Sequence, residues 1–432
     1  MELTAEVVVV GAGPAGAATA LMLAPFHRTL LLDRAGLNET APPSTRIGES
    51  LPAAAWRLFR DMGLWESFQG EDHAPRYAAR SLWGGSEPAS ADSICDPDGP
   101  GWHLDRTRFD AWLRQHAIGR GAPMVAPAHV THLVDTQNGW RLTANRHGRP
   151  LVITTRFVVD AGGRVAPLVR LLGGRSQPRD RLVCSWTHGS ARGDAGTTVT
   201  IADKNGWWYT APLPNGRRVL AFHTDADLPI TKGLVGSAAL LSHAREQPDL
   251  AALLGELDFR PDGPGGYCAA HSSWIEAASG PSWLAVGDAA LTCDPLSSQG
   301  LFNALYSALM AANALRRALA GDTDALMDYQ RIIARVVDAY RDHLAAWYSL
   351  ESRWPTLPFW ARRRAAPCEP QAEVPVAAID CGTAKPAPRS AQPYPARSWA
   401  GNRMAESETI RPPQTPWIKS SLLTTRPRLR NR

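Results

Sequence analysis

The sequence predicts an α/β fold, in which a dinucleotide-binding sheet carries an inserted antiparallel sheet and is followed by C-terminal helices. Three observations support this prediction. Residues 6–10 are an apolar, β-branched strand that leads into a glycine-rich turn and a helical pattern. A second apolar strand near 283–286 breaks at Gly287-Asp288 and, after Pro295, continues as a helical pattern. Between these two units, residues 181–223 alternate as several short strands.

The composition is that of a globular protein rather than a nucleic-acid-binding one. The length of 432 residues favours two or three domains, and 44% hydrophobic with 20% charged residues is typical of a soluble chain. The formal net charge is +5, but residues 362–432 hold 13 Lys and Arg against 5 Asp and Glu, so the remainder is slightly acidic. We therefore expect no nucleic-acid partner.

The six cysteines are scattered, without a CxxC pair or any metal-ligand spacing. This pattern predicts free thiols in a reducing compartment and no metal site. The chain begins directly with a strand pattern and no signal peptide, and it holds no run of about 18 apolar residues. We therefore expect a cytoplasmic protein without a membrane-spanning segment.

The turn after the first strand reads Gly11-Ala12-Gly13-Pro14-Ala15-Gly16. Glycines at this spacing permit a tight turn, the approach of a pyrophosphate and close packing of the next helix, whose N-terminus attracts phosphates. The following strand, residues 29–32, ends at Asp33, where a carboxylate binds a ribose hydroxyl. This order of strand, glycine turn, helix and acid predicts dinucleotide binding.

Residues 42–51 form a loop that leads into a predicted amphipathic helix at 52–62. Glu49 and Ser50 lie at the end of this loop. They either cap the helix or face the bound ligand.

Residues 66–101 are polar and rich in Gly and Pro, as expected of a surface excursion or a cover over an active site. A second amphipathic helix is predicted at 106–117. Arg106 at its start either reaches a phosphate or is simply solvated. Three further strands are predicted at 130–134, 140–143 and 151–154.

Two later strands end in an aspartate beside a glycine. Residues 156–163 read RFVVDAGG, with Asp160 and Gly162 at the end of the strand. The strand near 283 ends at Gly287-Asp288. Together with the N-terminal glycine turn, these strand ends predict one nucleotide site assembled from distant parts of the sequence.

The corner after Asp288 leads through Asp294 and Pro295 into a predicted helix at 299–319. We expect the backbone N–H groups of residues 296–300 to be unpaired there and to carry the positive end of the helix dipole. Such a corner suits a planar group that becomes anionic, as reduced flavin does, and Gly300 would leave no side chain against the ring. An ordinary strand-to-helix corner is the alternative.

The inserted sheet gives the predicted domain boundaries. Residues 1–180 and 270–320 form the nucleotide-binding domain, 181–269 the substrate domain and 321–361 a helical segment that includes a helix at 325–350. Trp207, Trp208 and Tyr209 either pack in the core of the inserted sheet or line a substrate pocket. Residues 362–432 contain 11 prolines and little apolar periodicity, which predicts a disordered or partner-bound tail.

The chain resembles the group A flavoprotein monooxygenases and the flavin-dependent halogenases, the class that includes p-hydroxybenzoate hydroxylase. The likeness covers about residues 5–350 and rests on GAGPAG at 11–16, Arg106 before its helix, DAGG at 160–163 and GDAALTCDPLSSQG at 287–300. It implies a Rossmann-type FAD-binding domain. It also implies FAD contacts from Asp33, Arg34, Arg46, Gly48, Ser50, Arg106, Val130, Asp160, Gly162, Asp288, Pro295, Ser298, Gly300 and Leu301.

Two shorter motifs, RIGESLP at 46–52 and DPLSSQG at 294–300, are most similar to those of flavoproteins that mature tryptophylquinone cofactors. This resemblance implies hydroxylation of a tryptophan in a partner polypeptide, with O₂ activated at FAD and NAD(P)H as the electron donor. Glu49 and Asp294 lie in these motifs and are the candidate catalytic residues. For each, a structural role remains the alternative.

Three other functions remain open. Halogenases of this class resemble one another in a lysine upstream of a W-x-W-x-I-P segment, but here no lysine precedes Lys204 and the comparable stretch reads GWWYTAP at 206–212. A hydroxylase of small aromatic molecules would share the same fold. A flavoprotein that only binds a partner, without turnover, is the third.

Overall fold

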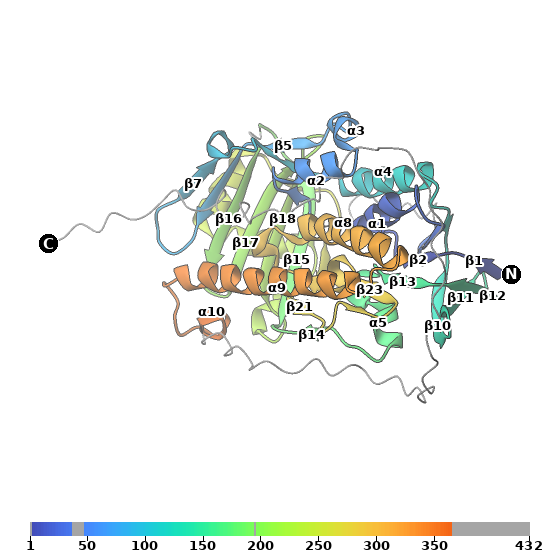
Figure 1. Ribbon diagram of the computed structural model, residues 1–432. Helices are drawn as coiled ribbons and strands as arrows, with labels where there is room; N and C mark the ends of the chain where they lie inside the picture. The colour runs from blue at the N-terminus through green and yellow to red at the C-terminus, as the bar shows by residue number, and fades with distance from the viewer. Residues whose placement is uncertain (1, 37–46, 194–195, 365–432) are drawn as a thin grey trace, which may run out of the picture. The chain divides into compact units, whose positions relative to one another are not determined.

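The computed structural model describes residues 2–36, 47–193 and 196–364, and a six-stranded sheet, here called the central sheet, holds the N-terminal strand of the glycine turn. Four neighbouring strands of this sheet are parallel and almost completely buried, as expected of strands that are covered on both faces. Their sequences are correspondingly continuous apolar runs. In spatial order the strands are β22 (Ser279–Gly280), β23 (Trp283–Ala285), β13 (Phe157–Asp160), β2 (Val7–Val10), β3 (Thr29–Leu32) and β9 (Met124–Val125). Three of them, β2, β13 and β23, are labelled in Figure 1.

Three helices pack together beside this sheet. They are α1 (Pro14–Leu23), α4 (Arg106–Gly119) and α8 (Gly300–Leu319). Helix α1 contacts both of the others and is buried on nearly all sides, which its alanine-rich sequence permits, because its one polar side chain, Thr19, donates to the carbonyl of Ala15. The predicted strand–turn–helix unit is therefore confirmed, and it lies in the middle of the domain.

A second sheet, with four strands, lies next to the central one. Its strands are, in spatial order, β1 (Glu2–Thr4), β12 (Arg149–Thr155), β11 (Gly139–Arg146) and β10 (His129–Thr136). The last three correspond to the three strands predicted near 130–154, and they form an antiparallel meander.

The inserted sheet is larger than expected. Its eight strands are β15 (Leu182–Ser190), β16 (Thr197–Asp203), β17 (Gly206–Leu213), β18 (Arg217–Asp225), β19 (Arg260–Pro261), β20 (Gly266–Ala269), β6 (Ala78–Leu82) and β7 (Ala89–Asp92). Residues 66–101, predicted to be a surface excursion or a cover over an active site, supply two strands of this sheet, because β6 pairs in parallel with β16 and β7 extends the exposed edge. These strands are short and half exposed, so they lack the apolar alternation that identifies a strand.

The remaining elements connect the sheets. Two small sheets consist of β4 (Ser50–Leu51), β8 (Gly101–His103) and β5 (Ala74–Arg76), and of β14 (Gln177–Pro178), β21 (Ser273–Trp274) and β24 (Leu291–Thr292). Short helices are α2 (Ala55–Asp61), α3 (Trp65–Gln69), α5 (Pro167–Leu171), α6 (Ser237–Ala244) and α7 (Pro248–Glu256). Single 3₁₀ turns are η1 (Ser93–Cys95), η2 (Gly163–Val165), η3 (Pro229–Gly233), η4 (Gly287–Ala289) and η5 (Pro295–Ser297). Helix α2 is shorter than the predicted 52–62.

The C-terminal part of the described chain is helical. Helix α9 (Ala325–Leu350), orange in Figure 1, packs against α8 and is followed by α10 (Pro358–Arg364). None of the helices in the described ranges has the length and apolar character needed to cross a bilayer.

The boundary of the predicted tail needs correction. Arg362 and Arg363 belong to α10 and donate to the buried carboxylate of Asp225, so the arginine run is part of the folded body. Trp360 in the same helix is fully buried, and its indole N–H donates to the carbonyl of Asp203. The rest of the predicted tail, residues 365–432, lies outside the described residues.

We predict that Asp225→Asn lowers the free energy of unfolding by about 3–5 kcal/mol, because it leaves the Arg363 guanidinium buried without a full counter-charge. Asp225 is 2% exposed and Arg363 9% exposed, at 2.7 Å. Asp227→Asn is the matched control, because Asp227 pairs with Arg362 at the exposed edge of the same cluster. Urea unfolding of both variants tests this, and equal destabilisation would contradict it.

Candidate functional site

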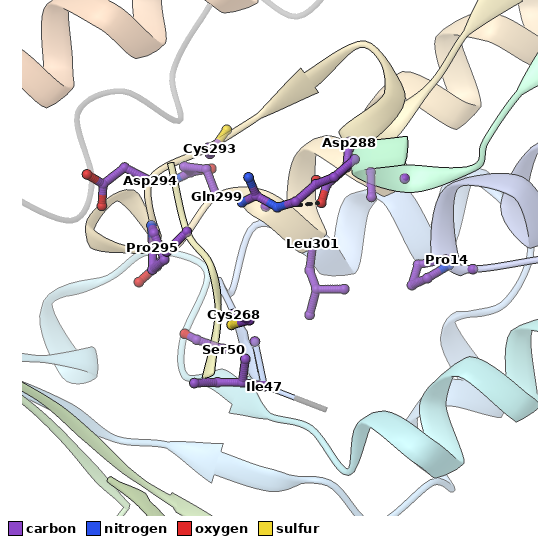
Figure 2. Close-up of a pocket in the computed structure, with 18 of the residues that line it drawn as sticks. Pro14, Ile47, Ser50, Cys268, Asp288, Cys293, Asp294, Pro295, Gln299 and Leu301 are labelled. Carbon is purple, nitrogen blue, oxygen red and sulfur yellow. Dashed lines mark ion pairs between the residues drawn. The ribbon is translucent and has the colours of Figure 1, made fainter. Parts of the chain in front are cut away.

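A cavity of about 480 Å³ lies between the central sheet and the inserted sheet (Figure 2). Its wall combines the glycine turn at 13–15, the loop at 47–50, the corner at 293–301 and strands β17, β18 and β20. This volume falls within the range of about 300–1,000 Å³ that small-molecule sites occupy. The segments that the sequence motifs single out therefore meet at one place.

Close backbone packing brings the three motif segments together. Gly11 has φ of +109°, and a Cβ there would overlap the carbonyl of Ala161. A Cβ on Gly16 would overlap the carbonyl of Gly11, and one on Gly287 would lie 2.8 Å from the Cβ of Ala15. These three glycines do not line the cavity themselves. They allow the chain segments that form its wall to pack directly against each other.

Two other glycines face open space, as a bound cofactor requires. Gly13 and Gly300 both line the cavity, and a Cβ built on either would meet no atom within 4 Å. A flat or phosphate-bearing ligand can therefore approach the backbone at both positions. The glycine cradle fits FAD on this criterion.

The helix that leaves this corner starts within one residue of the predicted 299–319. Helix α8 begins at Gly300, and the N–H groups of Leu296 and Gln299 donate to Asp294 and to the hydroxyl of Ser297. The expectation that the N–H groups of 296–300 are all unpaired is therefore wrong, because η5 uses most of them. The positive end of the helix dipole lies at residues 300–302 instead, still at the cavity wall.

Three predicted cofactor residues, Asp33, Arg34 and Val130, are not among the residues that line the cavity. The Asp33 carboxylate accepts from the N–H of Ala12 at 2.6 Å and of Ala35 at 2.8 Å, so it ties the glycine turn to the end of β3. Arg34 is exposed, and the Val130 side chain is buried in the core. FAD contacts from these three residues, with Asp33 at the adenosine ribose, stay a prediction.

Asp160 has a structural role that the sequence did not predict. Its carboxylate oxygens accept from the N–H groups of Gly162 and Val169, and burial raises the pKa of this group to about 6. Because both oxygens are engaged, Asp160 holds the DAGG turn and α5 rather than pointing at a ligand. Gly162 is required there, because a Cβ would overlap the ring of Pro167.

Asp288 does line the cavity. Its carboxylate lies 3.9 Å from Nε of Arg164, an ion pair marked in Figure 2. The side chain is 40% exposed, so a ligand in the cavity would cover it. Arg164 also donates to the carbonyl of His271 and is held in place on the wall.

Arg106 fixes the loop that precedes Glu49. Its guanidinium donates to Asp110 and to the carbonyls of Ile47 and Gly48, while the residue also lines the cavity. Arg106 thus has a positioning role in addition to any contact with a phosphate. Arg46 lies outside the described residues.

Most predicted cofactor residues are in the cavity wall. From the first half of the chain these are Gly13, Pro14, Ala15, Gly48, Ser50 and Arg106. From the second half they are Asp288, Pro295, Ser298, Gly300 and Leu301.

Glu49 is the most unusual polar group of the site. It is 2% exposed and lines the cavity, and neither carboxylate oxygen has a hydrogen-bond partner within the described part of the chain. Nε2 of His188, a residue 4% exposed, lies 3.5 Å from Oε1. The alternative that Glu49 caps the helix at 55–61 is wrong, because α2 has no side-chain cap. A buried acceptor without a donor indicates a site built for a ligand.

Asp294 lines the same cavity but its oxygens are engaged. One accepts from the N–H of Leu296 at 2.9 Å and the other from the hydroxyl of Tyr348 at 2.7 Å. Burial raises the pKa of the Asp294 carboxyl to about 6. These contacts favour the structural alternative, in which Asp294 fixes the corner against α9.

The three aromatic residues of β17 lie on two opposite faces of the inserted sheet. Tyr209 lines the cavity, and Trp207 stacks against His223 with ring centroids 3.7 Å apart, one layer behind the wall. Trp208 points to the opposite face, where it packs on Phe222. Alternation along a strand therefore removes Trp208 from the predicted substrate pocket.

Other residues of the wall were not predicted from the sequence. Arg164, Cys184, His223 and Cys268 all line the cavity. Only Arg164 carries a local signal, because it directly follows the DAGG motif. The other three require the register of the inserted sheet. No cluster of His, Cys, Asp and Glu suited to a metal ion occurs in the described ranges.

Comparison with known proteins gives consistent results. A sequence model of the tryptophan halogenase family matches residues 85–401. The putative FAD-dependent oxidoreductase LodB of Marinomonas mediterranea is 29% identical, over 83% of this chain and 97% of its own.

Two solved structures are similar at 25% identity. The flavin-dependent halogenase CmlS superposes with a TM-score of 0.69, over 85% of this chain and 68% of that chain. Peptidyl tryptophan dihydroxylase QhpG, essential for tryptophylquinone cofactor biogenesis, superposes with a TM-score of 0.66 over 83% and 78%.

The predicted α/β fold is thereby confirmed, and so is the expectation of FAD as cofactor. Because the family model covers well over half of the sequence, the chain belongs to the tryptophan halogenase family, and it is an FAD-dependent enzyme that acts with O₂.

Proposed function

We propose that this enzyme is a monooxygenase that hydroxylates the indole ring of a tryptophan in a partner polypeptide, as a step in tryptophylquinone formation. The observation that carries the proposal is the buried, unpartnered carboxylate of Glu49 in the wall of the cavity. An acceptor in this position matches the N–H of an indole. The reported activity of QhpG supports the same substrate class.

The cavity wall supplies what the cofactor needs. FAD, when bound, supplies the redox chemistry by taking up two electrons and activating O₂. Gly13 and Gly300 leave the backbone open to it, and the start of α8 presents N–H groups and the positive end of a dipole. Arg106 and Asp288 line the same wall and offer a donor and an acceptor. NAD(P)H is the proposed electron donor, directly or through a separate reductase.

Glu49 would act on the substrate proton. As oxygen adds to the ring, electron density leaves the indole nitrogen and its N–H becomes more acidic. A carboxylate held at that N–H accepts the hydrogen bond and then takes the proton. His188 is the neighbouring side chain, with Nε2 3.5 Å from Oε1 of Glu49.

The positions of the lysines favour hydroxylation over halogenation. The halogenases that this chain resembles hold the halogenating species with a lysine. Lys204 and Lys232, the lysines within the described ranges, are exposed and neither is among the residues that line the cavity. The family match makes halogenation the second candidate.

The test is mass spectrometry of products after incubation with FAD, NAD(P)H and O₂, in buffer with chloride and bromide. The substrates are free tryptophan and a tryptophan-bearing polypeptide of an amine dehydrogenase or amino-acid oxidase. Oxygen gained by the polypeptide supports the proposal. A halogen gained by either substrate would identify a halogenase. Oxygenation of free tryptophan at about 1 per second or faster would identify a small-aromatic hydroxylase, and NAD(P)H oxidation without any product would leave only a binding role.

We predict that Gly13→Leu abolishes flavin binding without unfolding the protein. The Cβ has open space, so the side chain enters the cavity and overlaps the pyrophosphate. Gly119→Leu is the matched control, because Gly119 also has open space but lies on the exposed end of α4. The measurement is the flavin-to-protein absorbance ratio. Equal flavin content in the two variants would refute this placement of FAD.

We predict that Glu49→Gln lowers kcat for substrate oxygenation by about 10²-fold or more, with flavin content unchanged, because the amide cannot take the proton. Asp294→Asn is the comparison, since both Asp294 oxygens already accept hydrogen bonds. We expect it to lower thermal stability more than kcat. The opposite pattern, with a large kcat loss in Asp294→Asn and none in Glu49→Gln, would contradict the assignment.

A further inference from the structure

Two thiols face each other across neighbouring strands of the inserted sheet. Cys184 on β15 and Cys268 on β20 are direct partners in an antiparallel register. Directly opposed residues share one face of the sheet, with Cα atoms about 4.5–5.5 Å apart. A disulfide spans Cα separations of about 4.4–6.8 Å. Both cysteines are free in this structure, and the backbone needs no large movement to join them.

The two thiols differ in acidity. A hydrogen bond from Cys184 lowers the pKa of the Cys268 thiol to about 7, with help from the Arg164 charge and the Trp186 indole and against burial and Glu49. Burial raises the pKa of Cys184 well above its usual value. Cys268 is thus the more acidic thiol of the pair, while the S–H of Cys184 also donates to the carbonyl of Ser185 at 3.8 Å. A thiolate beside a protonated thiol is the arrangement of a reactive pair.

The pair lies in the wall of the cavity where O₂ is activated. Cys184 and Cys268 both line it, together with Glu49 and Arg164 (Figure 2 labels Cys268). An FAD enzyme that reduces O₂ without oxidising a substrate releases hydrogen peroxide, the two-electron reduction product. Peroxide formed in this cavity is therefore released beside the two thiols. A structural role, as small apolar side chains in the core of the sheet, is the alternative.

We propose that Cys184 and Cys268 are a redox-active dithiol that reduces hydrogen peroxide at the wall of the cavity and closes to a disulfide. The Cys268 thiolate attacks one peroxide oxygen, the O–O bond breaks, and the other oxygen leaves as hydroxide, which gains a proton to become water. Cys184 then attacks the Cys268 sulfenic acid, an S–S bond forms, and a second water leaves. The two thiols lose two electrons and peroxide gains them. A small-molecule or protein thiol reverses the reaction by exchange.

This proposal goes beyond the proposed function, because it requires only FAD and O₂ and not a tryptophan substrate. The experiment that tests it adds hydrogen peroxide and detects the disulfide, so it needs no tryptophan substrate. Failure of the proposal is therefore distinguishable from failure of the hydroxylation proposal.

The test treats the full-length, FAD-loaded protein with hydrogen peroxide, alkylates the remaining thiols and identifies disulfides by mass spectrometry of non-reduced peptides. We expect a peptide pair joined through Cys184 and Cys268 that disappears on treatment with dithiothreitol. Cys293 is the matched internal control: it lines the same cavity, but burial raises its pKa to about 12. Cys95 is the exposed control. Recovery of Cys184 and Cys268 as alkylated thiols, or a disulfide from either to another cysteine, would overturn the proposal.

Two variants separate the roles within the pair. In Cys184→Ala, Cys268 should stop at the sulfenic acid and be trapped by dimedone. In Cys268→Ala, Cys184 should remain an unoxidised thiol, because it stays protonated. Equal oxidation of the remaining cysteine in both variants would contradict the assigned roles.

We also predict a pH signature that a packing role would not produce. Alkylation of Cys268 should accelerate as the pH rises through about 7, because only the thiolate reacts. Cys184→Ala removes the hydrogen bond that lowers this pKa, so the midpoint should move upward. An unchanged midpoint would show that Cys184 does not activate Cys268.

Discussion

Contact between backbones, permitted by glycine, is the constraint on which the site depends. The glycine turn, the DAGG segment and the corner after β23 are separated by more than a hundred residues each, yet they touch at Gly11, Gly16 and Gly287. A single Cβ at any of these positions would overlap main-chain atoms or the Ala15 methyl group. Gly13 and Gly300 belong to the same motifs but line the cavity, where an added Cβ would meet no atom within 4 Å. Packing and ligand access thus come from different glycines of the same motifs.

The buried carboxylates of the site fall into two groups, according to whether their oxygens accept hydrogen bonds from the protein itself. Asp160 and Asp294 each place both oxygens on donors of the chain itself, so they hold turns in place. Glu49 is equally buried, but neither of its oxygens accepts a hydrogen bond within the described residues, and the ring of His188 lies 3.5 Å away. A buried carboxylate without donors is costly, and a folded protein keeps one where a ligand or substrate completes its hydrogen bonds. This contrast, rather than motif membership, is the reason to assign chemistry to Glu49.

The sequence predicted the backbone of the site better than its side chains. The strands, the glycine turn and the Asp288 corner were predictable because their apolar runs and glycines act locally. The strands at 78–92 were missed, since short half-exposed strands carry no periodic signal. Trp208 faces away from the cavity because of strand alternation, and Cys184 meets Cys268 through a register that no local pattern specifies. Asp160 and Asp294 looked like ligand-binding groups because sequence does not reveal which donors fold back onto a carboxylate.

The central claim is that this cavity transfers one atom of O₂ to the ring of a tryptophan held beside Glu49. The most direct measurement is oxygen-isotope labelling of single turnovers of the holoenzyme, with ¹⁸O₂ in ordinary water and a tryptophan-bearing polypeptide as substrate. The account predicts that the new oxygen on the indole carries the ¹⁸O label in the product peptide. An unlabelled oxygen would place its origin in water, and a ring that gains halogen instead of oxygen would make the enzyme a halogenase; either result would contradict the account.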